Sequence, residues 1–300
     1  MSPDVPVAII AFNRPQLVAR LIDRLAIVKP ASVFLICDGA RAERREEREK
    51  VAAVRGLLEK LPWKCEIHRD YAVENMGCQK RIFTGLNAVF EQVNQAMILE
   101  DDCLPEYEFF RFAEELLGKY AEDGRVGSVC GTTFTERKTL SKSYRFSRYP
   151  LIWGWATWRR AWESCRGTLA AMDDRLVEEV LSDIFPRYRE QTYWRYVLNR
   201  CRNSELDTWD YLWAFTCWRN RLLHAIPNVS LVENVGCGPD STHTRRPDPW
   251  IAPVGRMEFP LVHPDSMTID NALDAGIEDL VYSKSVGNRF RWLIRSLCRR

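Results

Sequence analysis

Three consecutive carboxylates, Glu100, Asp101 and Asp102, follow the short apolar run 97–99. A run of that length predicts a buried strand. Adjacent carboxylates repel one another, so the cluster is favourable if a divalent cation, itself carrying the phosphates of a ligand, binds to it. The alternative is a solvated acidic turn that caps the next helix. The place at the end of a strand favours a ligand site, because open α/β sheets bind their ligands at the carboxyl ends of strands.

Polar side chains also end two earlier apolar runs. Arg14 comes shortly after the run 7–12, and Asp38 follows the run 33–37. An Arg can hold a phosphate, and an Asp can accept a hydrogen bond from a base N–H or a ribose hydroxyl. Because the carboxyl ends of parallel strands meet at one edge of a sheet, we expect Arg14, Asp38 and the acidic cluster to share one rim.

The elements that must position these residues alternate between strands and helices. The sequence predicts strands at 7–12, 33–37, 65–68 and 96–99, and helices after 15, over 41–50, over 77–93 and after 105. This alternation predicts an α/β fold with a mostly parallel sheet flanked by helices. After about Arg125 the pattern changes to one more strand at 126–130, a helical stretch at 172–198 and a Gly- and Pro-rich loop at 236–260.

Composition limits the classes of function. The 300 residues are 46% hydrophobic, enough for a sizeable core, and 43 basic against 41 acidic side chains give a net charge of +2, so no general affinity for nucleic acid is expected. The ten cysteines include no CxxC pair, and no apolar segment is long enough to span a bilayer. Without a secretory signal, the sequence predicts reduced thiols and a cytoplasmic location.

Several motifs together resemble a known family. They are Pro6–Arg14, the strand before Asp38, Ile98–Asp102, Gly154-Trp155 and Trp209-Asp210. They occur in the order seen in N-acetylglucosaminyltransferase I-type enzymes, and the chain resembles that GT-A glycosyltransferase family and its bacterial family-2-like relatives over about residues 6–235. The resemblance implies a GT-A, Rossmann-like fold. It also implies an inverting transfer from a nucleotide sugar, usually UDP-linked, with Mn²⁺ or Mg²⁺.

The resemblance also implies roles for the residues at the strand ends. Arg14 would contact the nucleotide phosphates or the base, and Asp38 would contact the uracil. Asp101 would face the donor ribose or sugar, with Glu100 in the same donor-binding group. Asp102 would ligate the metal.

Asp210 falls where the family places its catalytic base, in a Trp-Asp-Asp-Trp segment. This chain reads Trp-Asp-Tyr-Leu-Trp, so the second acid is absent and the base is left open between Asp210 and Asp207. His243 is expected either as a second metal or phosphate ligand or as an ordinary loop residue. Asn75 and Gly77 are expected to shape a loop on the donor side.

The sequence therefore predicts a hexosyl- or N-acetylhexosaminyl-transferase that acts on a glycan or a lipid-linked saccharide. We expect 1–125 to bind the nucleotide sugar, 126–260 to form the acceptor-binding and catalytic half of the same domain, and 261–300 to be a C-terminal extension. One alternative is a non-catalytic sugar-nucleotide or glycan-binding protein. Another is a sugar nucleotidyltransferase, which needs a Gly-rich loop after the first strand, where this chain reads Phe12–Pro15 without a Gly.

The segment 289–300 is basic and amphipathic. Its apolar residues recur at helical spacing, at Phe290, Leu293, Ile294, Leu297 and Cys298, and the rest of the helical wheel holds arginines and no acid. A helix of this kind is typical of an interfacial anchor on anionic lipid, which would place the protein peripherally at the inner face of a membrane. The alternative is a helix docked on the protein's own core.

Overall fold

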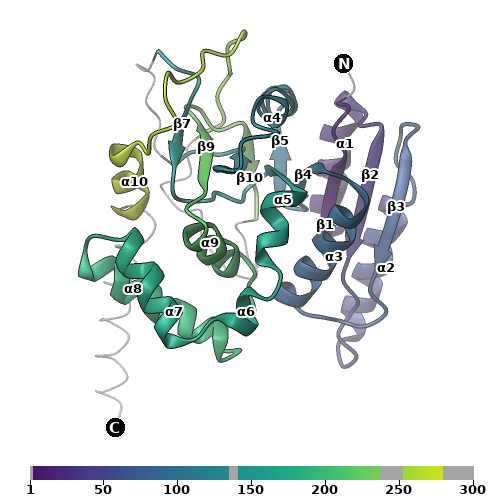
Figure 1. Cartoon of the computed structure of the whole chain (residues 1–300). Helices are drawn as coiled ribbons and strands as arrows, with labels where there is room; N and C mark the ends of the chain where they lie inside the picture. Colours follow the sequence, from purple (N-terminus) through teal and green to yellow (C-terminus); the bar gives the residue numbers. More distant parts are fainter. Residues whose placement is uncertain (1–2, 135–140, 237–252, 280–300) are drawn as a thin grey trace.

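The computed structural model describes residues 3–134, 141–236 and 253–279 (Figure 1). Within these residues, eight strands form one sheet in the order β3-β2-β1-β4-β8-β6-β9-β7, and helices cover both of its faces. A second, small sheet pairs β10 (Val232–Asn234) with β5 (Cys103–Pro105). The α/β class with a mostly parallel, helix-flanked sheet is confirmed.

The first half of the chain forms the continuously parallel part of the sheet. Its strands are β1 (Val7–Ala11), β2 (Ser32–Cys37), β3 (Glu66–Tyr71) and β4 (Gln95–Glu100), joined by α1 (Pro15–Val28), α2 (Arg45–Leu58) and α3 (Cys78–Gln92). Neighbouring strands pair in parallel in the order β3-β2-β1-β4. All of β1 is buried, as expected of a strand covered on both faces.

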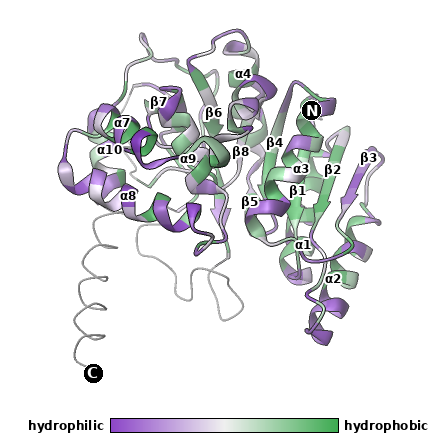
Figure 2. Ribbon diagram, turned by 60° about the horizontal axis from the view of Figure 1, so that its bottom comes forward, coloured by the Kyte–Doolittle hydropathy of each residue, from purple (hydrophilic) through white to green (hydrophobic). Residues whose placement is uncertain are grey.

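The helices form two layers because successive side chains of a strand point to opposite faces. Ile9 and Leu35 pack in a core with α1, α2 and α4 (Tyr107–Lys119). Ile10 and Phe34 pack on the other face, in a core with α3, α5 (Arg159–Trp162) and α9 (Asp210–Arg219). Figure 2 shows the inner strands as hydrophobic and the edge strand β3 as hydrophilic, which protects that edge from pairing with other chains.

The second half differs from the sequence prediction at β8 (Trp155–Trp158). This strand lies antiparallel between β4 and β6 (Val126–Cys130), and β9 (Leu223–Pro227) and β7 (Tyr144–Ser147) complete the sheet. So short an aromatic run shows no clear period, which is why the sequence does not predict the strand. Because β8 is antiparallel, its first residue, Trp155, pairs with Ile98 near the acidic end of β4.

The expected helical stretch 172–198 is two helices, α7 (Asp174–Ile184) and α8 (Tyr188–Arg202). The break is at Phe185, which is extended because the following Pro186 disfavours a helical conformation there. A short α6 (Thr168–Ala171) precedes them, and α10 (Asn271–Ile277) follows later in the chain. Among the described residues no helix is long and apolar enough to span a membrane. The predicted basic helix at 289–300 lies outside those residues.

Candidate functional site

Arg14 joins the end of β1 to the end of β4. One guanidinium nitrogen, Nη1, lies 2.9 Å from Oδ2 of Asp102, and Nη2 donates to Oδ1 of Asp101. Burial by itself lowers the pKa of Arg14, but the charges of the two aspartates raise it above its usual range. The parallel pairing of β1 with β4 thus brings together the two strand ends that the sequence predicts on one rim.

Two carboxyl groups at this rim, those of Glu100 and Asp101, have raised pKa values. Asp101 is 2% exposed, and burial raises its pKa to about 6, although the charge of Arg14 opposes the rise. Burial is the largest cause that raises the pKa of Glu100 well above its usual range. The negative charges of Asp102, Asp101 and Asp210 add to this rise. Because a nearby cation favours the ionised form of a carboxyl group, binding of an added cation at this rim would be coupled to ionisation of these groups.

Asp38, just after the end of β2, accepts hydrogen bonds from within the protein. Its Oδ1 accepts hydrogen bonds from the N–H groups of Gly39 and Met76 at 2.8 and 2.9 Å. Its Oδ2 accepts from Nδ2 of Asn75 at 2.9 Å. Asp38 lies at the rim where it is expected, but in this arrangement it holds the loop before α3. Its predicted contact with uracil stays a prediction.

Asp207 also accepts hydrogen bonds from backbone N–H groups. Its Oδ2 and Oδ1 accept the N–H groups of Cys78 and Gln79, each at 2.9 Å. These are the first two residues of α3, whose N-cap residue is Gly77 and therefore has no side chain to cap the helix. The carboxylate of Asp207 takes that place, because unpaired N–H groups at a helix start favour an anionic acceptor.

Asp210 is the first residue of α9, and its place follows from a stack of tryptophans. Trp209, one residue earlier, stacks on Trp155 with ring centroids 5.5 Å apart. Trp155 in turn belongs to β8 and pairs with Ile98 of β4. This chain of contacts brings the start of α9 beside the end of β4, where Asp210 contributes to the raised pKa of Glu100. Oδ1 of Asp210 accepts a hydrogen bond from the hydroxyl of Thr208.

A Mn²⁺ or Mg²⁺ ion is expected at this rim from the family resemblance. Among the described residues, no three His, Cys, Asp or Glu side chains converge as a closed protein site requires. Mg²⁺ in phosphate sites, however, is commonly held by one or two carboxylates and the phosphates of the substrate. Asp102, with a side chain 16% exposed, fits that smaller role, and the buried Oδ2 of Asp101 has no hydrogen-bond partner among those residues. His243 lies outside them.

Two residues that the sequence analysis missed complete the surroundings of Asp102. Nδ2 of Asn234 donates to Oδ1 of Asp102 at 3.4 Å. A Cβ atom on Gly236 would lie 2.2 Å from Oδ2 of the same aspartate, so a larger residue there would displace this carboxylate. The pairing of β10 with β5 brings both residues close to Asp102. The local sequence does not predict this long-range contact.

The tryptophans around β8 contribute mainly to packing. Trp155 and Trp158 are 1% and 3% exposed, so neither can lie under a bound sugar ring. Trp153 is partly buried, with its ring edge-on to Phe134 at 5.1 Å. Of the three, Trp153 alone keeps surface that a ligand could contact.

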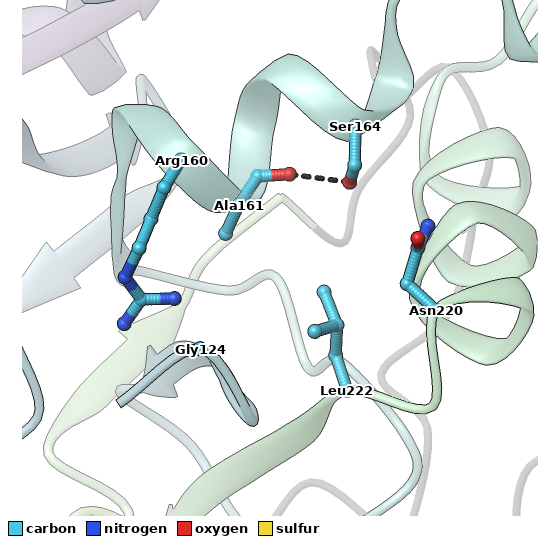
Figure 3. A pocket seen from close by; sticks show the side chains of 6 residues that line it. All are labelled: Gly124, Arg160, Ala161, Ser164, Asn220 and Leu222. Atoms are coloured by element: carbon cyan, nitrogen blue, oxygen red, sulfur yellow. Dashed lines mark hydrogen bonds between the residues drawn. The ribbon is translucent and has the colours of Figure 1, made fainter. Parts of the chain in front are cut away.

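A cavity of about 240 Å³ lies near the end of β8 and the starts of β6 and β9 (Figure 3). It is lined by Gly124, Arg160, Ala161, Ser164, Asn220 and Leu222. Arg160 follows the end of β8, which pairs with the start of β4 and not with its acidic end. The guanidinium group donates to the carbonyl oxygens of Tyr120, Ala121 and Val126, so it holds α4 against β6. This cavity is separate from the acidic rim.

No model of a protein family matches the chain. Among solved structures, the chain is similar to 4-diphosphocytidyl-2C-methyl-D-erythritol synthase from Anaerococcus prevotii DSM 20548, with 14% identity and a TM-score of 0.37 over 57% of this chain and 78% of that one. It is also similar to UDP-glucose pyrophosphorylase in complex with UDP-glucose, with 9% identity and a TM-score of 0.37 over 76% of this chain and 91% of that one. Likeness at this level carries no argument about substrate. Membership of the N-acetylglucosaminyltransferase I-type family stays a prediction.

Proposed function

We propose that this chain is an inverting GT-A glycosyltransferase. It transfers a hexosyl or N-acetylhexosaminyl group from a nucleotide-diphosphate donor, UDP-linked by resemblance, to a glycan or lipid-linked saccharide. The proposal is carried by one observation, the convergence of Arg14, Asp102 and Asp210 around the carboxyl end of β4. The reaction needs a positive group for phosphate, a cation ligand and a carboxylate base in one place.

On the donor side, Arg14 is a positive group in direct contact with Asp101 and Asp102, and its fork of N–H donors suits phosphate oxygens. Asp102 would hold a Mn²⁺ or Mg²⁺ ion together with the diphosphate, and the bound ion would neutralise charge on that leaving group. Such an ion suits this rim because the carboxylates outnumber Arg14 there.

On the acceptor side, Asp210 acts as the general base. As the acceptor hydroxyl oxygen bonds to the anomeric carbon, its proton passes to the carboxylate of Asp210. The bond from the anomeric carbon to the diphosphate oxygen breaks on the opposite face, and its electron pair leaves with the diphosphate. Asp207 is less suited to this task, because both of its oxygens already accept N–H groups of α3.

The test begins with a thermal-shift screen of nucleotide sugars, with and without Mn²⁺, to find the donor, since a ligand that binds the folded state raises its melting temperature.

Asp210→Asn, which is nearly isosteric, should then keep donor binding and lose at least about 10²-fold in transfer rate. The matched control is Asp183→Asn, which changes an exposed aspartate on α7 paired with Arg221 and should transfer normally. Normal transfer by Asp210→Asn would refute the assignment of the base. Donor binding with no transfer to any saccharide would favour the non-catalytic binding protein.

A further inference from the structure

The segment that leads from β3 into α3 is held from both halves of the chain. We call residues 75–79, which include the first two residues of α3, the bridge segment. Its start is bound by Asp38, from the end of β2, and its end is bound by Asp207, from the connection between α8 and α9. Two aspartates that the sequence places in the donor and catalytic sites therefore both bind this one segment.

The contact at Asp38 is tight. Oδ1 of Asp38 accepts the N–H of Met76, and Nδ2 of Asn75 bridges Oδ2 of Asp38 and the carbonyl of Gly39 at 2.9 and 3.0 Å. A Cβ on Gly39 would lie only 2.3 Å from the carbonyl carbon of Glu74. Glu74 and the start of the bridge segment therefore pack directly against the end of β2.

The contact at Asp207 is equally specific. Gly77 has a φ of +80°, which favours glycine, and a Cβ on it would lie 2.6 Å from Oδ2 of Asp207, so a larger residue would also displace this carboxylate. The acceptor of the first N–H of α3 comes from 129 residues further along the chain. A helix is normally capped by its own N-cap residue, so this arrangement ties two distant segments together.

Asp207 lies three residues before Asp210, and each residue between them also has a fixed contact. Thr208 donates to Asp210, and Trp209 stacks on Trp155. Removing Asp207 would free the beginning of this short segment while leaving its end packed in the core.

We propose that Asp207 is a positioning residue for the transfer reaction. By capping α3, it fixes the segment 207–210 against the donor side and so sets where the carboxylate of Asp210 meets the acceptor hydroxyl. This inference rests on the proposed function and assigns Asp207 a role other than that of the base. Small displacements of a reacting group are costly, since a shift of about 1 Å can lower a rate by about 10²-fold.

The experiment compares the full chain with Asp207→Ala, Asp207→Asn and the control Asp173→Ala. Asp173 is an exposed aspartate that caps α7 by accepting the N–H of Leu176 at 2.7 Å, so its removal costs a similar cap away from the rim. Melting temperature, kcat and the KM for the donor are measured for each protein. Hydrogen exchange of the Cys78 and Gln79 amides reports independently on the cap.

We expect Asp207→Ala to lower kcat by about 10- to 10²-fold while the KM for the donor changes by less than about threefold. Asp207→Asn keeps one acceptor oxygen and should fall between the alanine variant and the wild type. Asp173→Ala should lower the melting temperature to a similar extent with normal kcat and KM. Both substitutions of Asp207 should speed exchange of the Cys78 and Gln79 amides.

If Asp207→Ala loses only melting temperature, as Asp173→Ala does, the cap is structural and the positioning role is overturned. A wild-type protein that transfers no sugar would instead refute the proposed function, and the positioning role with it. In that case, faster exchange at Cys78 and Gln79 would still show that the cap itself exists. The two failures are therefore distinguishable.

Discussion

Arg14 partly neutralises two carboxylates that would otherwise repel each other. The Asp101 side chain is 3% exposed and that of Arg14 is 20% exposed, so water screens the pair poorly. Removing one partner of a buried pair costs much more than removing one partner of a surface pair, because the remaining charge stays buried. The contribution of Arg14 to folding should therefore be large, although it sits in a site that would also bind a ligand.

Arg14→Gln should lower the free energy of unfolding by about 3 kcal/mol, measured by urea denaturation. A divalent cation can replace the lost positive charge between Asp101 and Asp102, so Mn²⁺ should raise the melting temperature of this variant more than that of the wild type. The control is Arg24→Gln on α1, the helix that follows Arg14, since Arg24 and Glu106 form a pair with side chains 35% and 32% exposed. That change should cost less than about 1 kcal/mol and gain nothing from Mn²⁺. Equal losses for the two variants would contradict the prediction.

Which residues meet at the rim is predictable only in part. Arg14 and the acidic cluster can be placed together from sequence, because each comes at or shortly after the end of a buried run and parallel strands align their carboxyl ends. The hydrogen-bond partners of Asp38 and Asp207 cannot be predicted from sequence. An aspartate in a loop has the same sequence pattern whether it binds a ligand or a distant backbone N–H. The choice between Asp207 and Asp210 depends on this difference.

Elements of the first half follow from local pattern, while those of the second half depend on contacts distant in sequence. The early strands β1, β2 and β4 are apolar runs next to amphipathic helices, and that arrangement favours parallel βα units. β8 and β10 are short, and they form strands by pairing with segments distant in sequence. β8 pairs with β4 and β6, and β10 pairs with β5. The sequence therefore predicts the donor side of the rim better than the acceptor side.

The docking of α10 shows how an element of low intrinsic stability is retained. The helix is short, but Asp274 accepts hydrogen bonds from the hydroxyl of Ser147 at 2.5 Å and from Nε of Arg148 at 2.7 Å. At its end, Oε1 of Glu278 accepts the hydroxyl of Tyr149 at 2.5 Å. Burial raises the pKa of Glu278 to about 7. The hydrogen bond from Tyr149 opposes this rise, and the neighbouring Glu190 of α8 adds to it.

This raised pKa predicts a pH-dependent stability. The stabilisation of the protonated Glu278 is fully present below its unfolded pKa of 4.5 and is lost as the pH rises through about 7. Glu278→Gln cannot ionise, so relative to the wild type it should gain up to about 3 kcal/mol between pH 4.5 and pH 8, at about 1.4 kcal/mol per pKa unit. Denaturant unfolding at several pH values measures this difference. Glu179→Gln, at an exposed position on α7, should show none. Parallel pH profiles for Glu278→Gln and the wild type would exclude the effect.

At the scale of the whole molecule, charge is nearly balanced but unevenly distributed. The chain carries a net charge of +2, yet its last twelve residues hold arginines and no acid. Those residues lie outside the described part of the chain, so the anchor expected from their pattern stays a prediction. An enzyme that uses a lipid-linked acceptor gains from such an anchor, because it keeps the active site near a substrate confined to the membrane surface.

The test of the anchor is co-sedimentation with liposomes. The full chain should pellet with anionic vesicles, and a chain that ends at Gly287 should not, because each arginine near such a surface contributes about 1 kcal/mol of attraction. Added salt should weaken the binding, since it screens that attraction. Arg295→Glu with Arg299→Glu keeps the apolar residues and reverses the charge, so it separates electrostatic attraction from burial of the apolar face. Equal pelleting of the full and shortened chains, or equal binding to neutral and anionic vesicles, would leave the docked helix as the better account of this segment.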